Sequence, residues 1–321
     1  MKKRYLLLVI LAILLSNLTA CQVQRPKICY TVYPIQFLVE KLAGDKVETC
    51  RISDNSNILR SQIVDDYQSL LSDADLFLYM GQVEPYMHIY LSNIKQNNDL
   101  DIIDLASTTS IYSFRRYTEV QVGESKVYIE SPYYESSLFD DIDTYDSDPY
   151  IWMDPIAMTS LASQIRDWLV INYTEESDYF ERQYENLEAE LARLDSEFQT
   201  LRMSISNIKI VTMTPSFGVW QKNYNIDVYP IILSRYGVLP SDNQLALIKQ
   251  RIIADEVKYI AYETNMSEDM IALYESIKDE LGLVEIKLSN LAALSEKQIS
   301  DKQNYIHIMY ENLAQLETLA D

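Results

Sequence analysis

Residues 180–201 read FERQYENLEAELARLDSEFQTL, and the spacing of apolar side chains in this stretch decides the fold. Steps of four and three residues separate them, which places them on one stripe of an α-helix. The stripe comprises Phe180, Tyr184, Leu187, Leu191, Leu194, Phe198 and Leu201. Thr174 can cap the start of this helix, and Glu175 and Glu176 suit the positive end of its dipole. A helix over residues 175–204 would be about 45 Å long, the length of a whole domain.

Such a stripe serves either a dimeric coiled coil or packing against the protein's own body. The stripe covers about four heptads at most, and segments of mixed strand and helix character flank it. We therefore expect the helix to pack along the body and to join two halves of the chain.

Strand-like and helical segments alternate before the long helix. β-rich runs at residues 28–33, 47–52 and 74–79 alternate with helical spacing at residues 35–42 and 63–71. This alternation is typical of a parallel α/β sheet.

The same alternation returns after the long helix. Ser241 and Gln244 resemble a capping box that opens a helix to about residue 253. The other expected elements are strands at 208–213, 259–262 and 284–288 and helices at 217–224, 268–281 and 299–319.

The predicted fold class is therefore α/β. Two parallel-sheet lobes are joined by one long rigid helix, with a ligand cleft between the lobes. The predicted divisions are an N-terminal lobe at 21–172, the helix at 173–206 and a C-terminal lobe at 207–321. Residues 115–148, which are acidic, rich in tyrosine and without a clear period, are predicted to form a long surface loop.

The first twenty residues have the composition of an export signal. Lys2, Lys3 and Arg4 precede an apolar run at 6–15, which is too short to span a bilayer. The run is followed by Leu-Thr-Ala-Cys at 18–21, which resembles the lipoprotein box of bacteria. We expect cleavage after residue 20 and a lipid anchor on Cys21. An ordinary signal peptide with a chance cysteine is the alternative.

Charge and cysteine content exclude several classes of function. The net charge is −21, and removal of the signal would make the chain more acidic, which argues against a nucleic-acid partner. Cys29 and Cys50 lie in strand-like runs, so either a disulfide or two buried thiols is open. The sequence has no Gly-x-Ser-x-Gly elbow and no His-Glu-x-x-His motif, and we expect no enzymatic activity.

Several short motifs, in order, resemble the substrate-binding lipoproteins of zinc and manganese ABC importers, some of which are described as adhesins. The resemblance covers most of residues 27–317. Its markers are Tyr-Pro at 33–34, Leu-Ala-Gly-Asp-Lys-Val at 42–47, Asp-Ala-Asp-Leu-Phe-Leu-Tyr-Met-Gly at 73–81, Asp-Pro-Tyr-Ile-Trp-Met-Asp-Pro at 148–155 and Phe-Gly at 217–218.

The resemblance implies one divalent cation in the cleft, held by histidines and a carboxylate. The positions that match these ligands are Leu59, Tyr150, Thr214 and Ser289, so the expected metal site lacks its usual ligands. Asp154 and Glu263 are candidate cleft carboxylates, although Asp154 can equally cap a helix after Pro155. The only histidines, His88 and His307, are expected to be surface or packing residues.

The function that the resemblance implies is solute binding for an ABC importer on the extracytoplasmic face of the cell membrane. The implied partners are the permease and ATPase subunits, a small ligand or metal ion, and the membrane through its lipid anchor. No cofactor is certain, and zinc or manganese follows from the resemblance alone. A surface adhesion protein that kept the fold without transport is the alternative function.

Overall fold

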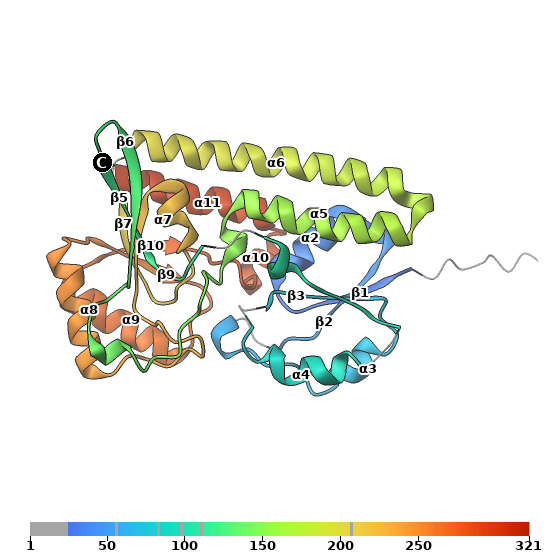
Figure 1. The fold of residues 1–321 in the computed structure, drawn as a ribbon, viewed down its shortest axis with the longest axis horizontal. Coiled ribbons are helices and arrows are strands. Elements are labelled where there is room, and N and C mark those ends of the chain that lie inside the picture. Colours follow the sequence, from blue (N-terminus) through green and yellow to red (C-terminus); the bar gives the residue numbers. More distant parts are fainter. Residues whose placement is uncertain are drawn as a thin grey trace, which may run out of the picture.

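The computed structural model describes residues 25–54, 57–81, 84–96, 99–109, 112–205 and 208–320. Two α/β lobes lie side by side, and the long helix α6 (Ser177–Ser204) runs along one side of both (Figure 1). The predicted fold class is confirmed. No helix in these ranges is both long and apolar enough to cross a membrane.

The N-terminal lobe is built on a parallel sheet with the strand order β2-β1-β3-β4. Its apolar runs are buried on both faces, as expected of a parallel sheet covered by helices. Ile28 and Leu78 face the main core, whereas Phe77 and Ile52 belong to a separate core on the opposite face. The elements are β1 (Lys27–Tyr30), α2 (Tyr33–Ala43), β2 (Glu48–Arg51), α3 (Tyr67–Leu71), β3 (Leu76–Tyr79), α4 (Met87–Ile94) and β4 (Asp101–Asp104).

Cys29 and Cys50 form a disulfide between the first two strands of this sheet. They are direct partners in the parallel register of β1 and β2, which brings their side chains to the same face of the sheet. The bond closes a loop that contains α2.

The predicted long helix is confirmed as α6 (Ser177–Ser204), with a short 3₁₀ turn at Thr174–Glu176 before it. Six of the seven stripe residues are fully buried, and Tyr184 is half-buried. The helix is not alone, because α5 (Pro155–Asn172) packs antiparallel along it. Asp154 caps α5, since its carboxylate accepts a hydrogen bond from the Ile156 amide at 2.8 Å. The long helix α6 contacts α2 in the first lobe and α7 (Val219–Tyr224) and α11 (Tyr305–Glu317) in the second, so it joins the two lobes as predicted, while α5 packs on α6 and α2.

The C-terminal lobe repeats the topology of the first. Its parallel sheet has the order β10-β9-β7-β8, which is again second, first, third and fourth when the strands are counted along the chain. Ser241 and Gln244 form the predicted capping box at the start of α8. The elements are β7 (Ile208–Thr212), α7 (Val219–Tyr224), β8 (Ile226–Pro230), α8 (Asp242–Ala254), β9 (Tyr259–Glu263), α9 (Glu268–Leu281), β10 (Val284–Leu288), α10 (Glu296–Ser300) and α11 (Tyr305–Glu317).

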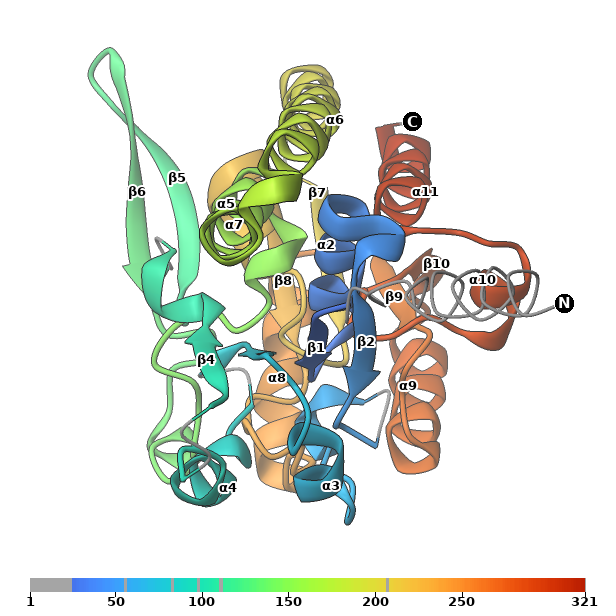
Figure 2. The same cartoon turned by 90° about the vertical axis from the view of Figure 1, so that its right-hand side faces the viewer.

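Two predictions are wrong in detail. The segment at 115–148 is not wholly a loop, because β5 (Arg116–Val122) and β6 (Ser125–Ser131) form an antiparallel hairpin that stands beside the C-terminal lobe (Figure 2). Polar and apolar residues alternate along both strands of this hairpin, but the acidic content of the whole segment obscured this alternation in the sequence. The expected helix at 299–319 is divided, because Lys302 between α10 and α11 has a positive φ of 53°.

Candidate ligand-binding cleft

Each sheet has one point where the chain reverses its winding direction. This point lies between β1 and β3 in the first lobe and between β7 and β9 in the second. Ligands of open α/β sheets bind outside the carboxyl ends of the strands at such a point. The residues that follow these four strands are therefore the first candidates for a site.

In the C-terminal lobe, the end of β9 carries the buried carboxylate of Glu263, which is 1% exposed. One oxygen accepts hydrogen bonds from the Met213 amide at 2.8 Å and the Thr214 amide at 3.0 Å. The other accepts from the Thr214 hydroxyl, and from Ser216 and Asn290 at 3.1 Å each. Burial raises the pKa of Glu263, and these donors oppose that rise. We call Thr214, Ser216, Glu263 and Asn290 the Glu263 cluster.

Tyr150 closes this cluster from the segment before α5. Its side chain is 1% exposed, and burial raises the pKa of its hydroxyl, with the Glu263 carboxylate adding to the rise. The hydroxyls of Ser216 and Thr214 act in the opposite direction, as hydrogen-bond partners of Tyr150. A neutral phenol therefore meets a carboxylate whose oxygens already accept five hydrogen bonds.

The N-terminal lobe has a counterpart at its own reversal point. Glu84, also 1% exposed, accepts hydrogen bonds from the Thr31 hydroxyl, the Met80 amide and the Tyr86 hydroxyl, each at 2.8 Å. Burial again raises the carboxyl pKa. A threonine after the first strand and a glutamate at or after the third thus pair in both lobes.

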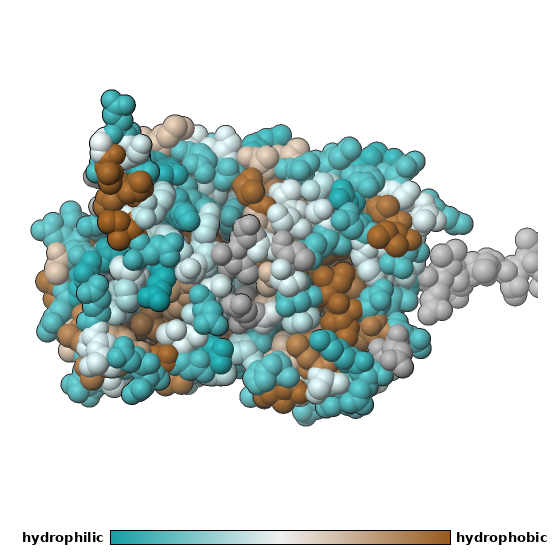
Figure 3. All heavy atoms as spheres, viewed as in Figure 1, coloured by the Kyte–Doolittle hydropathy of each residue, from teal (hydrophilic) through white to brown (hydrophobic). Residues whose placement is uncertain are grey.

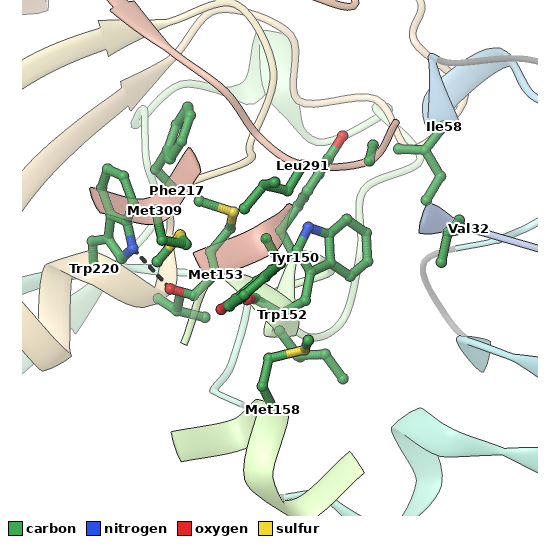
Figure 4. Close-up of a cluster of buried hydrophobic side chains, with 14 of the residues drawn as sticks. Val32, Ile58, Tyr150, Trp152, Met153, Met158, Phe217, Trp220, Leu291 and Met309 are labelled. Atoms are coloured by element: carbon green, nitrogen blue, oxygen red, sulfur yellow. Dashed lines mark hydrogen bonds between the residues drawn. The ribbon is translucent and has the colours of Figure 1, made fainter. Parts of the chain in front are cut away.

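The floor between the lobes is apolar and fully buried. Tyr150, Trp152 and Met153 lie in the middle of a cluster to which Val32 and Ile58 contribute from one lobe (Figure 4). From the other lobe, Phe217, Trp220, Leu291 and Met309 complete it. The Trp152 indole donates to the Asn290 carbonyl at 2.8 Å, and the Trp220 indole donates to the Met153 carbonyl at 2.9 Å. The two lobes therefore share one continuous core.

A second contact crosses between the lobes at the rim of the cleft. The Arg60 guanidinium binds both carboxylate oxygens of Asp269 at 2.8 Å and the Gly237 carbonyl at 2.8 Å. Leu59 lies beside Gly237, where an added Cβ would come within 3.1 Å of the Leu59 Cβ. Arg60 thus holds the loop that contains Leu59 against the second lobe.

A polar pocket of about 450 Å³ opens at the carboxyl ends of β3 and β4. The first lobe contributes Tyr79, Glu84, His88 and Asp104, and the facing side contributes Tyr145, Asp146 and Arg235. The Arg235 guanidinium pairs with Asp143 at 3.0 Å. Burial raises the pKa of Asp104. The pocket therefore has carboxylates on both sides and one guanidinium that is already paired.

The residues predicted from the sequence divide into two groups. Thr214, Tyr150 and Glu263 meet in the Glu263 cluster. Ser289 is buried but turned away, because its backbone exchanges hydrogen bonds with Asn312 and its hydroxyl accepts from the Leu291 amide. Leu59 is buried at the lobe contact, and Asp154 serves as a helix cap.

The two histidines lie elsewhere. His88 is exposed on α4 and lines the polar pocket, and His307 is exposed on α11. Within the described ranges, no three His, Cys, Asp or Glu side chains are grouped as metal ligands would be.

Comparison with known proteins places this arrangement in a family. Residues 28–319 match the family described as zinc-uptake complex component A, periplasmic. The chain belongs to this family. Its members are solute-binding proteins and not enzymes, as the sequence predicted.

Relatives within the family are distant. The zinc-binding lipoprotein AdcA of Streptococcus pneumoniae is 23% identical over 334 residues, which cover the whole of this chain and 62% of AdcA. This chain therefore spans about three-fifths of the length of that relative.

Solved structures share the fold. The zinc-bound ZnuA-like domain of the same AdcA has 20% identity and a TM-score of 0.69, over 92% of this chain and 99% of that one. The periplasmic zinc-binding protein TroA of Treponema pallidum has 16% identity and a TM-score of 0.71, over 92% and 99%. These likenesses establish the two-lobed architecture.

Three residues of the site were missed by sequence reasoning. Ser216 and Asn290 lie two and one positions beyond the predicted Thr214 and Ser289, and Glu84 lies shortly after the family marker at 73–81. Each follows the carboxyl end of a strand, which is the signal that could have identified them. The proposed lipidation site, Cys21, and the signal peptide lie outside the described residues.

Proposed function

We propose that this protein is the extracytoplasmic solute receptor of an ABC importer and that its cleft has lost the family's zinc site. The observation that carries the proposal is the Glu263 cluster, in which donors already occupy both oxygens of the carboxylate. A zinc ion needs unprotonated nitrogen, sulfur or oxygen ligands with free lone pairs. Tyr150, Thr214 and Ser216 offer neutral hydroxyls, and Leu59 offers none.

The polar pocket supports a different kind of ligand. Its volume of about 450 Å³ suits a small organic solute or a chelated metal, whereas a bare ion needs no such space. Asp104 and Asp146 favour a cationic group from opposite sides of the pocket, whereas Arg235 is already paired with Asp143. The proposed ligand therefore carries a positive charge.

Attachment to the membrane and to the importer completes the proposal. AdcA, which is similar over the full length of this chain, is named a lipoprotein, and Cys21 follows the sequence that suits lipidation. Replacing Cys21 by serine should release the protein from the membrane fraction. Retention of the C21S protein at the wild-type level would contradict the anchor.

A thermal-shift screen of metals, chelates and small cationic solutes tests the receptor function. We expect at least one chelate or solute to raise the melting temperature of the wild-type chain from Gln22 onward, and the D104N variant to lose that shift. D279N is the matched control, since Asp279 is exposed on α9 and away from the pocket. A screen without any ligand, or an equal shift in wild type and D104N, would count against this function.

A further inference from the structure

The hairpin of β5 and β6 has one apolar face whose outer part, around Val122, Val127 and Ile129, is exposed in the described structure. Its register pairs Thr118 with Ile129 and Val120 with Val127, so these four side chains lie on one face together with Val122. Val122, Val127 and Ile129 are 60%, 40% and 54% exposed. Figure 3 shows apolar residues gathered on the hairpin, at the upper left of the molecule.

The opposite face of the hairpin is the one that packs on the body. Tyr117 is buried and its amide donates to Gln221, while the Tyr128 hydroxyl donates to the Lys222 carbonyl at 3.0 Å. Arg202, at the end of α6, pairs with Glu119 at 3.0 Å. These contacts fix the hairpin, so the apolar face is held outward.

The edge of β6 is also open. Hydrogen bonds and packing tie β5 to α7 and β8, and the two-stranded sheet ends at β6 in the described structure. Figure 2 shows β6 on the side away from the lobes. An exposed strand of seven residues with unpaired backbone groups can pair with another strand.

We propose that β6 pairs antiparallel with β6 of a second copy of this chain and forms a four-stranded sheet across a two-fold axis. A register centred on Tyr128 places Lys126 opposite Glu130 of the second copy. The same register places Val127 opposite Ile129 and Ser125 opposite Ser131. Because the axis repeats every pair, the interface contains two opposite-charge pairs and two apolar pairs, and it sets no like charges opposite each other.

The distribution of charge on the chain favours a second copy as the partner of the β6 edge. A net charge of −21 makes copies repel one another over most of their surfaces. Apart from Arg116 at its base, which is buried and pairs with Asp255, the outer face of the hairpin has no charged side chain, and its edge carries one lysine and one glutamate in self-complementary positions. Pairing there also joins the two apolar faces into one.

Sedimentation velocity on the chain from Gln22 onward tests the proposal, with concentrations up to about 0.5 mM so that weak association is seen. We expect a monomer–dimer equilibrium in the wild type. K126E places two glutamates opposite each other at two symmetric positions and should weaken association about tenfold. The K126E/E130K variant reverses both charges and should restore association.

K258E is the matched control, because Lys258 is exposed in the second lobe and the variant changes the net charge by the same amount. Its association should stay near the wild-type value. Circular dichroism of each variant checks that the fold is kept, since Lys126 also pairs with Glu119 within the chain.

Three results would overturn the proposal. The first is a wild-type chain that stays monomeric throughout the concentration range. The second is a dimer that K126E and K258E weaken equally, or that K126E leaves unchanged. The third is a monomeric chain that binds lipid vesicles and loses that binding in I129D, which would assign the apolar face to a membrane.

Discussion

The Thr214 hydroxyl donates a hydrogen bond to the Glu263 carboxylate, at the point where the second sheet reverses its winding direction. Thr31 makes the corresponding bond to Glu84 in the first sheet. The same strand order produces the same pairing, because a side chain after the first strand and one after the third are neighbours in both lobes. In the second lobe the pair is surrounded by further donors, and this enclosure is the basis of our proposal that the cleft has lost the family's zinc site.

Replacing Glu263 by glutamine should destabilise the protein by about 2–4 kcal/mol. Thr214, Ser216 and Asn290 all donate hydrogen bonds to the Glu263 carboxylate. Glutamine has only one acceptor oxygen, so its N–H groups would point at these donors and leave them without an acceptor. Chemical denaturation of E263Q measures the loss. E188Q is the control, since Glu188 is exposed on α6. Equal stability of E263Q and wild type would show that the cluster is not the closed network described.

The stability of the protein should depend on pH through Asp148. Burial raises the pKa of its carboxyl to about 7, from an ordinary value of 3.8. Because the folded pKa is above the unfolded one, the protonated carboxyl stabilises the fold fully below pH 3.8, and this contribution is lost as the pH rises to about 7. The shift corresponds to roughly 4 kcal/mol.

Denaturation of wild type and D148N between pH 4 and pH 8 measures this contribution. The stability of the wild type relative to D148N should fall across this range and level off near pH 7. The stability of D279N, which changes an exposed carboxylate, should vary with pH as that of the wild type does. A constant difference between wild type and D148N would contradict the raised pKa.

Gly218 is required because Asp148 lies against it. A Cβ at residue 218 would stand 1.8 Å from an Asp148 carboxylate oxygen, so G218A must displace that side chain. We expect a loss of about 1–3 kcal/mol. The D148A/G218A double variant should lose less than the sum of the two single variants, because the collision is absent. Additive losses would show that Asp148 is not the obstacle.

The Arg60–Asp269 pair should hold the lobes together at the rim. Removing the charge in R60Q frees the loop around Leu59 from the second lobe, and small-angle scattering should then give a larger radius of gyration. K249Q is the control, because Lys249 pairs with Glu280 within one lobe. An unchanged radius in R60Q would mean that the shared core around Trp152 alone fixes the lobes.

Local pattern predicted much of this fold. The apolar stripe from Phe180 to Leu201 predicted the long helix α6. The bounds of α9 and β10 also follow the expected ranges closely, because helical periodicity marks the first and turn residues bound the second. For α5, the sequence indicated only a helix after Pro155 with Asp154 as its candidate cap. The hairpin was missed because the acidic content of residues 115–148 obscured its alternation of polar and apolar residues.

The site was harder to predict than the fold. Thr214, Tyr150 and Glu263 were found through motif positions, yet their shared contacts depend on how two strands and the segment before α5 meet in space. Ser216 and Asn290 follow the carboxyl ends of β7 and β10, but that position alone does not show which side chain reaches Glu263. Their part in the cluster follows from chain direction after β7 and β10, which tertiary packing sets.

Titration calorimetry with zinc, on the chain from Gln22 onward and after metal analysis by mass spectrometry, tests whether the cleft still binds zinc. We expect less than stoichiometric bound metal in the purified protein and no tight zinc-binding heat, because the oxygens of Glu263 are already occupied. Near-stoichiometric zinc that is bound tightly and is lost in E263Q would contradict this expectation, and would show that the hydroxyls of Tyr150 and Thr214 rearrange with Glu263 into a metal site.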